Sequence, residues 1–159
     1  MTKANIVEFR FLAEPTDVNF GGKVHGGMVM KWIDQASYAC AAQWSKRYSV
    51  TVSANGIRFI RPILVGQMIT VTARIVHTGK TSMHIYVVVR AGYPKDSGVV
   101  VTNRCFITFM ATDETGFPVK VQTYIPETEE DRLLEEVAIE AKQFAKTLDN
   151  DFEEKLGWK

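Results

Sequence analysis

The sequence predicts an α+β fold in a single domain, in which an antiparallel sheet wraps around a long central helix. Three observations lead to this prediction. A long, nearly uncharged segment at 27–46 has its apolar residues at helical spacing. Strand-like segments separated by short turns follow it, and an amphipathic, charged segment ends the chain. The 159 residues suffice for one domain with a substantial core.

The first elements are a strand and the central helix. Residues 5–12 alternate apolar and polar side chains, as a half-buried strand does, and a loop follows. The helix from about Gly27 to Lys46 carries one apolar stripe, and other apolar residues cover most of its remaining surface. Asp34 is the only acidic residue in this helix. A helix that is apolar nearly all round is expected to be buried on most sides.

Four further strands are expected after the helix, at 51–60, 68–77, 83–91 and 99–111. In 68–77 and 83–91 apolar residues recur at every second position, which places them on one face of each of these two strands. The turns between them are short, and short connections join antiparallel neighbours. One such sheet leaves a side of the central helix open, so we expect a second subunit to close it.

The chain is expected to end in a second helix on the surface. Thr128 and Asp131 resemble a capping box with Asp in place of the usual Glu. Acidic residues crowd its start and lysines lie toward its end, which suits the helix dipole. We therefore divide the chain into a domain at 1–125 and a C-terminal helical extension at 126–159, packed on the same domain.

Composition excludes several function classes. The net charge of +1 provides no general attraction for nucleic acid, and no apolar run is long enough to span a membrane. The two cysteines form no CxxC pair and the three histidines lack metal-ligand spacing, so no metal is expected. Residues 78–81, TGKT, match only the end of a phosphate loop and no helix follows them. With no apolar leader at the N-terminus, we expect a cytoplasmic location.

Three stretches together resemble the acyl-CoA hydrolase family of hotdog-fold thioesterases. They are VHGGMVMKWIDQASYACAA, TVSANGIRFIRPILVGQMITVTARI and GKTSMHIYVVV, and the match runs from about residue 5 to about 112. The resemblance implies a single hotdog domain and homodimers with a continuous sheet, often assembled as a trimer of dimers, a hexamer. It also implies hydrolysis of acyl-CoA, with coenzyme A as part of the substrate and no separate cofactor.

The candidate catalytic residues are Asp34, Gly26, Gly27 and Asn19. A carboxylate such as Asp34 can activate water as a general base or attack the thioester carbonyl directly. Gly26 and Gly27 can direct helix N-terminal N–H groups toward the carbonyl oxygen. Asn19 by itself is typical of a turn. His25 could act as a general acid or shape the turn, and the second interpretation is preferred. The resemblance pairs Asn19 with the helix acid of the opposing domain.

The glycine turn and Asp34 are far apart along the predicted helix. Gly27 and Asp34 lie about 10 Å apart along one helix, too far for both to reach one carbonyl carbon. The active site is therefore expected to combine Asp34 of one chain with the glycine turn of another.

For coenzyme A, two segments resemble the substrate-binding strands of the family, and an exposed strand edge can bind the amide-bearing pantetheine arm. The predicted residues are Val52, Ser53, Ala54, Lys80, Thr81, Ser82 and Met83. Two alternative functions are a non-catalytic acyl-CoA-binding sensor and a hotdog hydratase-dehydratase. The sensor would need no acid in the helix, and the hydratase would need a catalytic histidine paired with it.

Overall fold

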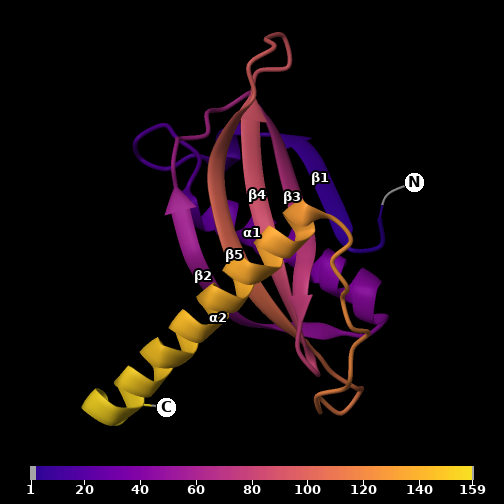
Figure 1. Cartoon of the computed structure of the whole chain (residues 1–159). Helices are drawn as coiled ribbons and strands as arrows, with labels where there is room; N and C mark the ends of the chain where they lie inside the picture. Colours follow the sequence, from indigo (N-terminus) through magenta and orange to yellow (C-terminus); the bar gives the residue numbers. More distant parts are fainter. Residues whose placement is uncertain (1–2, 159) are drawn as a thin grey trace.

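The computed structural model describes residues 3–158 and confirms the predicted α+β class and order of elements (Figure 1). The elements are β1 (Ile6–Leu12), a 3₁₀ turn (Pro15–Asp17), α1 (Gly26–Ser45), β2 (Ser49–Phe59), β3 (Met68–Thr78), β4 (Ser82–Gly92), β5 (Val100–Ala111) and α2 (Glu129–Leu156).

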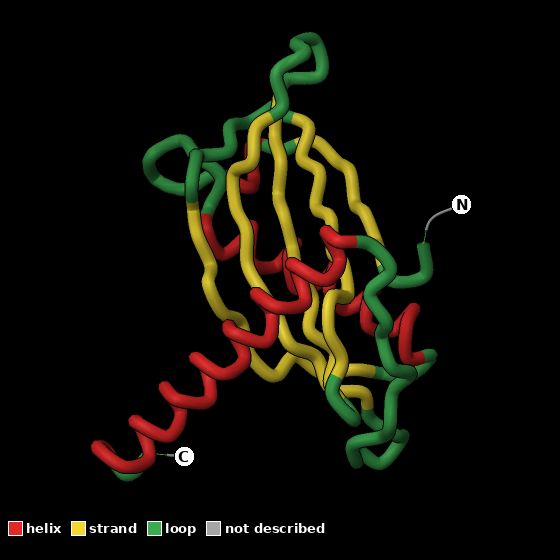
Figure 2. The backbone as a smooth tube through the Cα atoms, in the orientation of Figure 1, coloured by secondary structure: helices red, strands yellow, loops and turns green. Residues whose placement is uncertain are grey.

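One five-stranded sheet has the order β1-β3-β4-β5-β2, and every neighbouring pair is antiparallel. The sheet curves around α1, which contacts all five strands. Helix α2 lies across the opposite face of the sheet, against β2, β3 and β4 (Figure 2). The sheet thus has one face toward α1 and another toward α2.

The core between the sheet and α1 is formed by every second side chain of the central strands. In β4 the odd-numbered residues are fully buried on the α1 side, and β3 and β5 follow the same rule. The buried α1 side chains that meet them include Ile33, Ala36 and Cys40. The faces predicted for 68–77 and 83–91 are therefore confirmed.

The boundaries of α1 follow from local chemistry. His25 precedes the helix in an extended conformation, and its Nδ1 accepts a hydrogen bond from the Gly27 N–H. The helix ends where Lys46 adopts left-handed φ and ψ angles, with its N–H bonded to the Ala42 carbonyl. One side of α1 stays uncovered in the single chain, where Tyr38 is 39% exposed.

Helix α2 is fixed at its N-terminus by the predicted capping box of Thr128 and Asp131. Asp131 is buried and also forms an ion pair with Arg74 on β3. Burial by itself would raise the pKa of Asp131. The N–H groups of Glu127 and Thr128, the Thr128 hydroxyl and Arg74 outweigh it and lower this pKa to about 2. The division at residue 125 stays a prediction.

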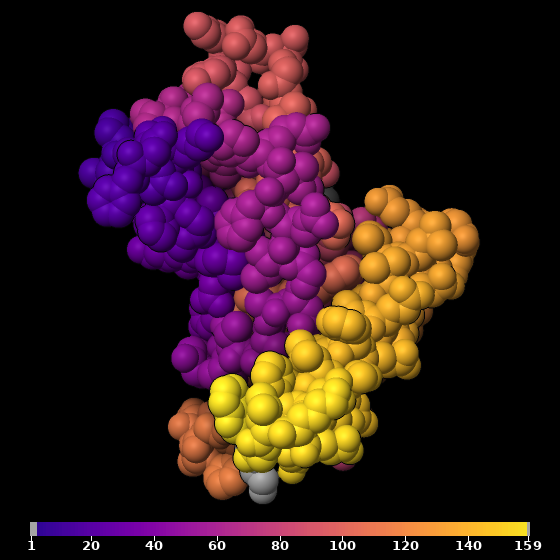
Figure 3. Space-filling model, turned by 90° about the vertical axis from the view of Figure 1, so that its left-hand side faces the viewer, coloured from indigo at the N-terminus to yellow at the C-terminus, as the bar shows by residue number. Residues whose placement is uncertain are grey.

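The edge of the sheet at β2 is uncovered. Figure 3 shows β2 exposed between the segment that precedes α1 and helix α2. Val52 and Phe59 on this strand are 57% and 56% exposed. A long edge strand with exposed apolar side chains can pair with a strand of another chain. No helix within residues 3–158 is long and apolar enough to cross a membrane.

Candidate active site

Asp34 lies in the middle of α1, half-buried, and is held by β2. Its Oδ1 accepts a hydrogen bond from the Thr51 hydroxyl at 2.7 Å. Thr51 pairs with the buried Phe109, so its side chain faces α1 at the open edge of the sheet. This contact fixes the direction of the carboxylate. Thr51 was not among the predicted site residues, since simple alternation puts it on the face opposite to the apolar Val52 and Ala54.

The turn before α1 offers one free N–H group rather than the expected two. The Gly27 N–H donates to His25 Nδ1 at 2.8 Å and is therefore engaged within the chain. The Gly26 N–H has no hydrogen-bond partner among the described residues. His25 acts as the helix cap, as its interpretation as a turn residue implies. Gly26 thus remains the candidate donor to a ligand oxygen.

A cleft of about 310 Å³ opens at this turn and brings Asn19 and Gly26 together. The Phe59 ring covers Gly26, and an added Cβ at Gly26 would lie 3.3 Å from it. Asn19 Oδ1 accepts N–H groups of Gly21 and Lys23 at 2.9 and 3.3 Å. Its amide nitrogen has no described partner, so Asn19 can stabilise the turn and still donate to a ligand.

Asn103 on β5 also lines this cleft, and it was not among the predicted site residues. It is only 2% exposed, and its Oδ1 has no hydrogen-bond partner among the described residues. A buried polar atom without a partner costs about 1–3 kcal/mol. Asn103 shares the inward face of β5 with Cys105, Ile107 and Phe109. A polar residue at an inward strand position is the signal that could have revealed it.

Asp34 does not line this cleft. Asp34 lies eight positions after Gly26 in one continuous helix, about 12 Å along the axis at 1.5 Å per residue. A single chain therefore holds two separate groups: Asn19 with Gly26, and Asp34 with Thr51.

The segments predicted to bind coenzyme A meet only in part. Ser53 and Ser82 line one cleft on the α2 side of the sheet. Lys80 is exposed and Thr81 half-buried, in the turn between β3 and β4, and Val52 and Ala54 are exposed on β2. Met83 differs from this prediction. Its side chain is wholly buried in the core and its backbone pairs with β3 and β5, so it is unavailable to a ligand.

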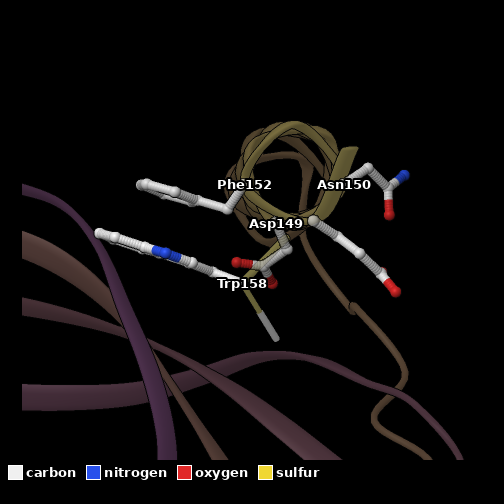
Figure 4. A pocket seen from close by; sticks show the side chains of 5 residues that line it. Asp149, Asn150, Phe152 and Trp158 are labelled. Carbon is white, nitrogen blue, oxygen red and sulfur yellow. The ribbon is translucent and has the colours of Figure 1, made fainter. Parts of the chain in front are cut away.

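Other features do not form a catalytic centre. Burial raises the pKa of the Cys40 and Cys105 thiols to about 12, so neither supplies a thiolate nucleophile. Residues 3–158 contain no group of three metal-ligating side chains. A larger cleft of about 690 Å³ lies at the end of α2, beside the stacked rings of Phe152 and Trp158 (Figure 4). None of the predicted site residues lines it.

Comparisons with known proteins identify the family of this chain. The family model of the thioesterase superfamily matches residues 21–96. Protein VdlD of Helicobacter pylori is 32% identical over 133 residues, which cover 84% of this chain and 76% of VdlD. The uncharacterized acyl-CoA thioester hydrolase YkhA of Bacillus subtilis is 30% identical over 126 residues, which cover 79% of this chain and 73% of YkhA.

A crystal structure of an apo-hexameric acyl-CoA thioesterase superposes with a TM-score of 0.87 and 30% identity, covering 91% of this chain and 92% of that one. Fold, sequence and the arrangement of α1 against the sheet therefore lead to one assignment. This chain belongs to the acyl-CoA thioester hydrolases of the thioesterase superfamily, the hotdog-fold family that its sequence resembles.

Proposed function

We propose that this protein hydrolyses acyl-CoA to free coenzyme A and a carboxylic acid, in active sites that two copies of the chain share. The separation of Asp34 from Gly26 along one helix is the observation that carries the proposal. Both groups must approach one thioester carbonyl, and reacting atoms need to lie within about 3–3.5 Å of each other. A second copy can provide the missing half.

In the proposed site, the Gly26 N–H and the positive end of the α1 dipole stabilise the carbonyl oxygen as negative charge develops on it. Asn19 donates a further hydrogen bond through its amide nitrogen. The Gly27 backbone contributes by letting His25 cap the helix, which fixes the direction of the Gly26 N–H.

Asp34 of the other copy then acts in one of two ways. As a general base it takes a proton from water, whose oxygen bonds to the carbonyl carbon as the carbon–sulfur bond breaks. As a nucleophile it forms a mixed anhydride with the acyl group, and water then cleaves the anhydride. In both routes the thiolate of coenzyme A leaves and is protonated, and Thr51 keeps the carboxylate oriented.

The proposed assembly is a homodimer in which the β2 edges of two copies pair into one continuous sheet. The exposed edge and the exposed side of α1 support this, since pairing there would cover both. A trimer of such dimers is the proposed full assembly, in keeping with the hexameric thioesterase of similar structure. Two buried, unpaired cysteines suit a reducing cytoplasm.

The first experiment measures thiol release from a panel of acyl-CoA substrates. Asp34→Ala is expected to lower the rate by at least ~100-fold, since general base catalysis contributes about 10²–10⁴. Asp96→Ala, at an exposed carboxylate in the β4–β5 turn, is the matched control and should leave the rate unchanged. Equally slow release by wild type and Asp34→Ala would favour a non-catalytic acyl-CoA sensor.

A complementation experiment tests whether the site is shared. Asp34→Ala and Gly26→Pro chains are each expected to be inactive alone. A dimer with one copy of each variant has one intact site, so co-expressed chains should regain activity, up to about half per mixed dimer. Mixed dimers that stay inactive would place Asp34 and Gly26 of the same chain in one site.

A further inference from the structure

A second polar cleft, of about 270 Å³, lies between α2 and the outer face of the sheet. Its sheet side is formed by β2, β4 and β5, and its other wall by the middle of α2. The polar side chains that line it include Ser53, Ser82, His84, Thr108, Lys142 and Lys146. The cleft therefore joins the predicted coenzyme A segments to a helix that begins at Glu129, outside the matched family region.

The floor of the cleft is a hydrogen-bonded group of neutral side chains. His84 is buried, with Nδ1 lying 3.0 Å from the Thr108 hydroxyl and Nε2 lying 3.3 Å from the Ser82 hydroxyl. Burial first, and then electrostatic interaction with the neighbouring His77 and Lys142, lower the pKa of His84 to about 4. The imidazole is therefore neutral near pH 7. The hydroxyl groups of Ser82 and Thr108 can each still donate a hydrogen bond to a ligand or accept one from it.

Two lysines supply positive charge above this floor. Lys142 and Lys146 are one helical turn apart and both line the cleft. Neither forms an ion pair with any residue between 3 and 158, whereas Arg132 and Lys155 on the same helix do. Lys142 Nζ lies 4.0 Å from the point that a Cβ atom on Gly79 would occupy, so it sits over the β3–β4 turn.

Ammonium groups beside hydroxyl donors are suited to a phosphate, because phosphate oxygens accept several charge-assisted hydrogen bonds at once. Asp149 is the one acidic residue among those lining the cleft, against the two lysines.

We infer that this cleft binds a phosphate of the coenzyme A moiety, with Lys142 and Lys146 of α2 as its cationic ligands. The inference rests on the proposed function, since acyl-CoA is the proposed substrate. It gives α2 a part in substrate binding. Two sources of phosphate are available in coenzyme A, the 3′-phosphate of the ribose and the diphosphate, and they share the same chemistry.

Calorimetry of the whole 159-residue chain with coenzyme A, dephospho-coenzyme A and pantetheine tests the inference. Lys142→Ala/Lys146→Ala is expected to weaken coenzyme A binding at least ~10-fold, because charge-assisted hydrogen bonds are lost. If the 3′-phosphate is the ligand, dephospho-coenzyme A affinity should not change. If the diphosphate is the ligand, both nucleotides should weaken together. Lys95→Ala, at an exposed lysine of the β4–β5 turn, is the matched control and should bind as wild type does.

Hydrolysis of an acyl-pantetheine, which carries no phosphate, separates this inference from the proposed function. The double variant is expected to hydrolyse it at the wild-type rate, and the His84 ring resonances should shift on coenzyme A binding only in wild type. A coenzyme A Kd within twofold of wild type in the double variant would overturn the inference, whatever the hydrolysis rate. Absence of hydrolysis by wild type would instead refute the proposed function.

Discussion

Gly26→Pro is a sharp test of the oxyanion-binding role of the α1 N-terminus. Gly26 is the first residue of α1 and its N–H has no partner within the described chain. Proline is favoured at this first helical position and lacks only the N–H group. His25 has φ −62° and ψ 132°, the extended conformation that a residue before proline adopts. The substitution should therefore remove one donor and leave the helix and its His25 cap in place.

The expected loss follows from the role of that donor. Removing one hydrogen bond to a developing oxyanion costs about 10²–10³ in kcat, or about 2.7–4 kcal/mol. Gly26→Ala is the matched control, because it keeps the N–H and adds a Cβ 3.3 Å from the Phe59 ring, as the proline does. A small displacement of that ring should cost Gly26→Ala only a few-fold in rate.

The assay is thiol release from a short-chain acyl-CoA at saturating substrate, with thermal melting of each variant to verify folding. The expected result is a kcat for Gly26→Pro at least ~100-fold below that of Gly26→Ala, at similar Tm. Equal kcat values for the two variants, both folded, would refute the assignment of the Gly26 N–H as an oxyanion donor. The carbonyl would then have to be stabilised elsewhere, for example by Asn19 alone.

Three further predictions concern Thr51, Asn103 and Asp131. Thr51→Val removes the hydrogen bond to the Asp34 carboxylate, which is worth about 1.5–3 kcal/mol, so hydrolysis should slow by about 10–150-fold. Thr51→Ser keeps the hydroxyl and should stay active. A fully active valine variant would contradict the role of Thr51. Asn103→Leu removes a buried polar group whose Oδ1 has no hydrogen-bond partner, so thermal melting should show Tm raised by about 2–4 °C for each 1 kcal/mol gained. Thiol release should slow in the same variant. A lowered Tm would show that the unpartnered Asn103 oxygen does not destabilise the fold. Asp131 has a pKa of about 2 in the folded chain, below its ordinary value of 3.8, so its stabilisation is present above about pH 4 and lost as pH falls toward 2. Urea unfolding should show Asp131→Asn about 2 kcal/mol less stable at pH 7 and nearly equal to wild type at pH 2, and a gap independent of pH would contradict this.

Much of the fold was predictable because it depends on local pattern. The helical spacing of apolar residues predicted α1 to within one residue of its start and end, and alternation predicted the inward faces of β3 and β4. The capping box of Thr128 and Asp131 was readable as a motif spanning four residues. Short turns settled the antiparallel arrangement, since only neighbours can be joined by so few residues.

The site was predictable only where its chemistry is local. Asp34 stood out as an acid in an apolar helix, and the glycines before it marked a helix start. Sequence could not tell that His25 takes the Gly27 N–H and leaves that of Gly26 free, because the choice depends on the rotamer of His25. Met83 was misjudged as a coenzyme A contact for a different reason. That prediction followed the family resemblance, although alternation already placed Met83 on the same face as Ile85 and Val87.

The sequence by itself determined which segments are helices and strands, their order, and the residue types that hydrolysis of a thioester requires. Tertiary structure alone decided which distant residues meet: Thr51 with Asp34, Asn103 with Gly26, and Lys142 with Ser82. The physical reason is that periodicity and capping are set by neighbours along the chain. Such long-range contacts depend instead on strand register, on a bulge that turns Thr51 and Ser53 to opposite faces, and on how the sheet curves around α1.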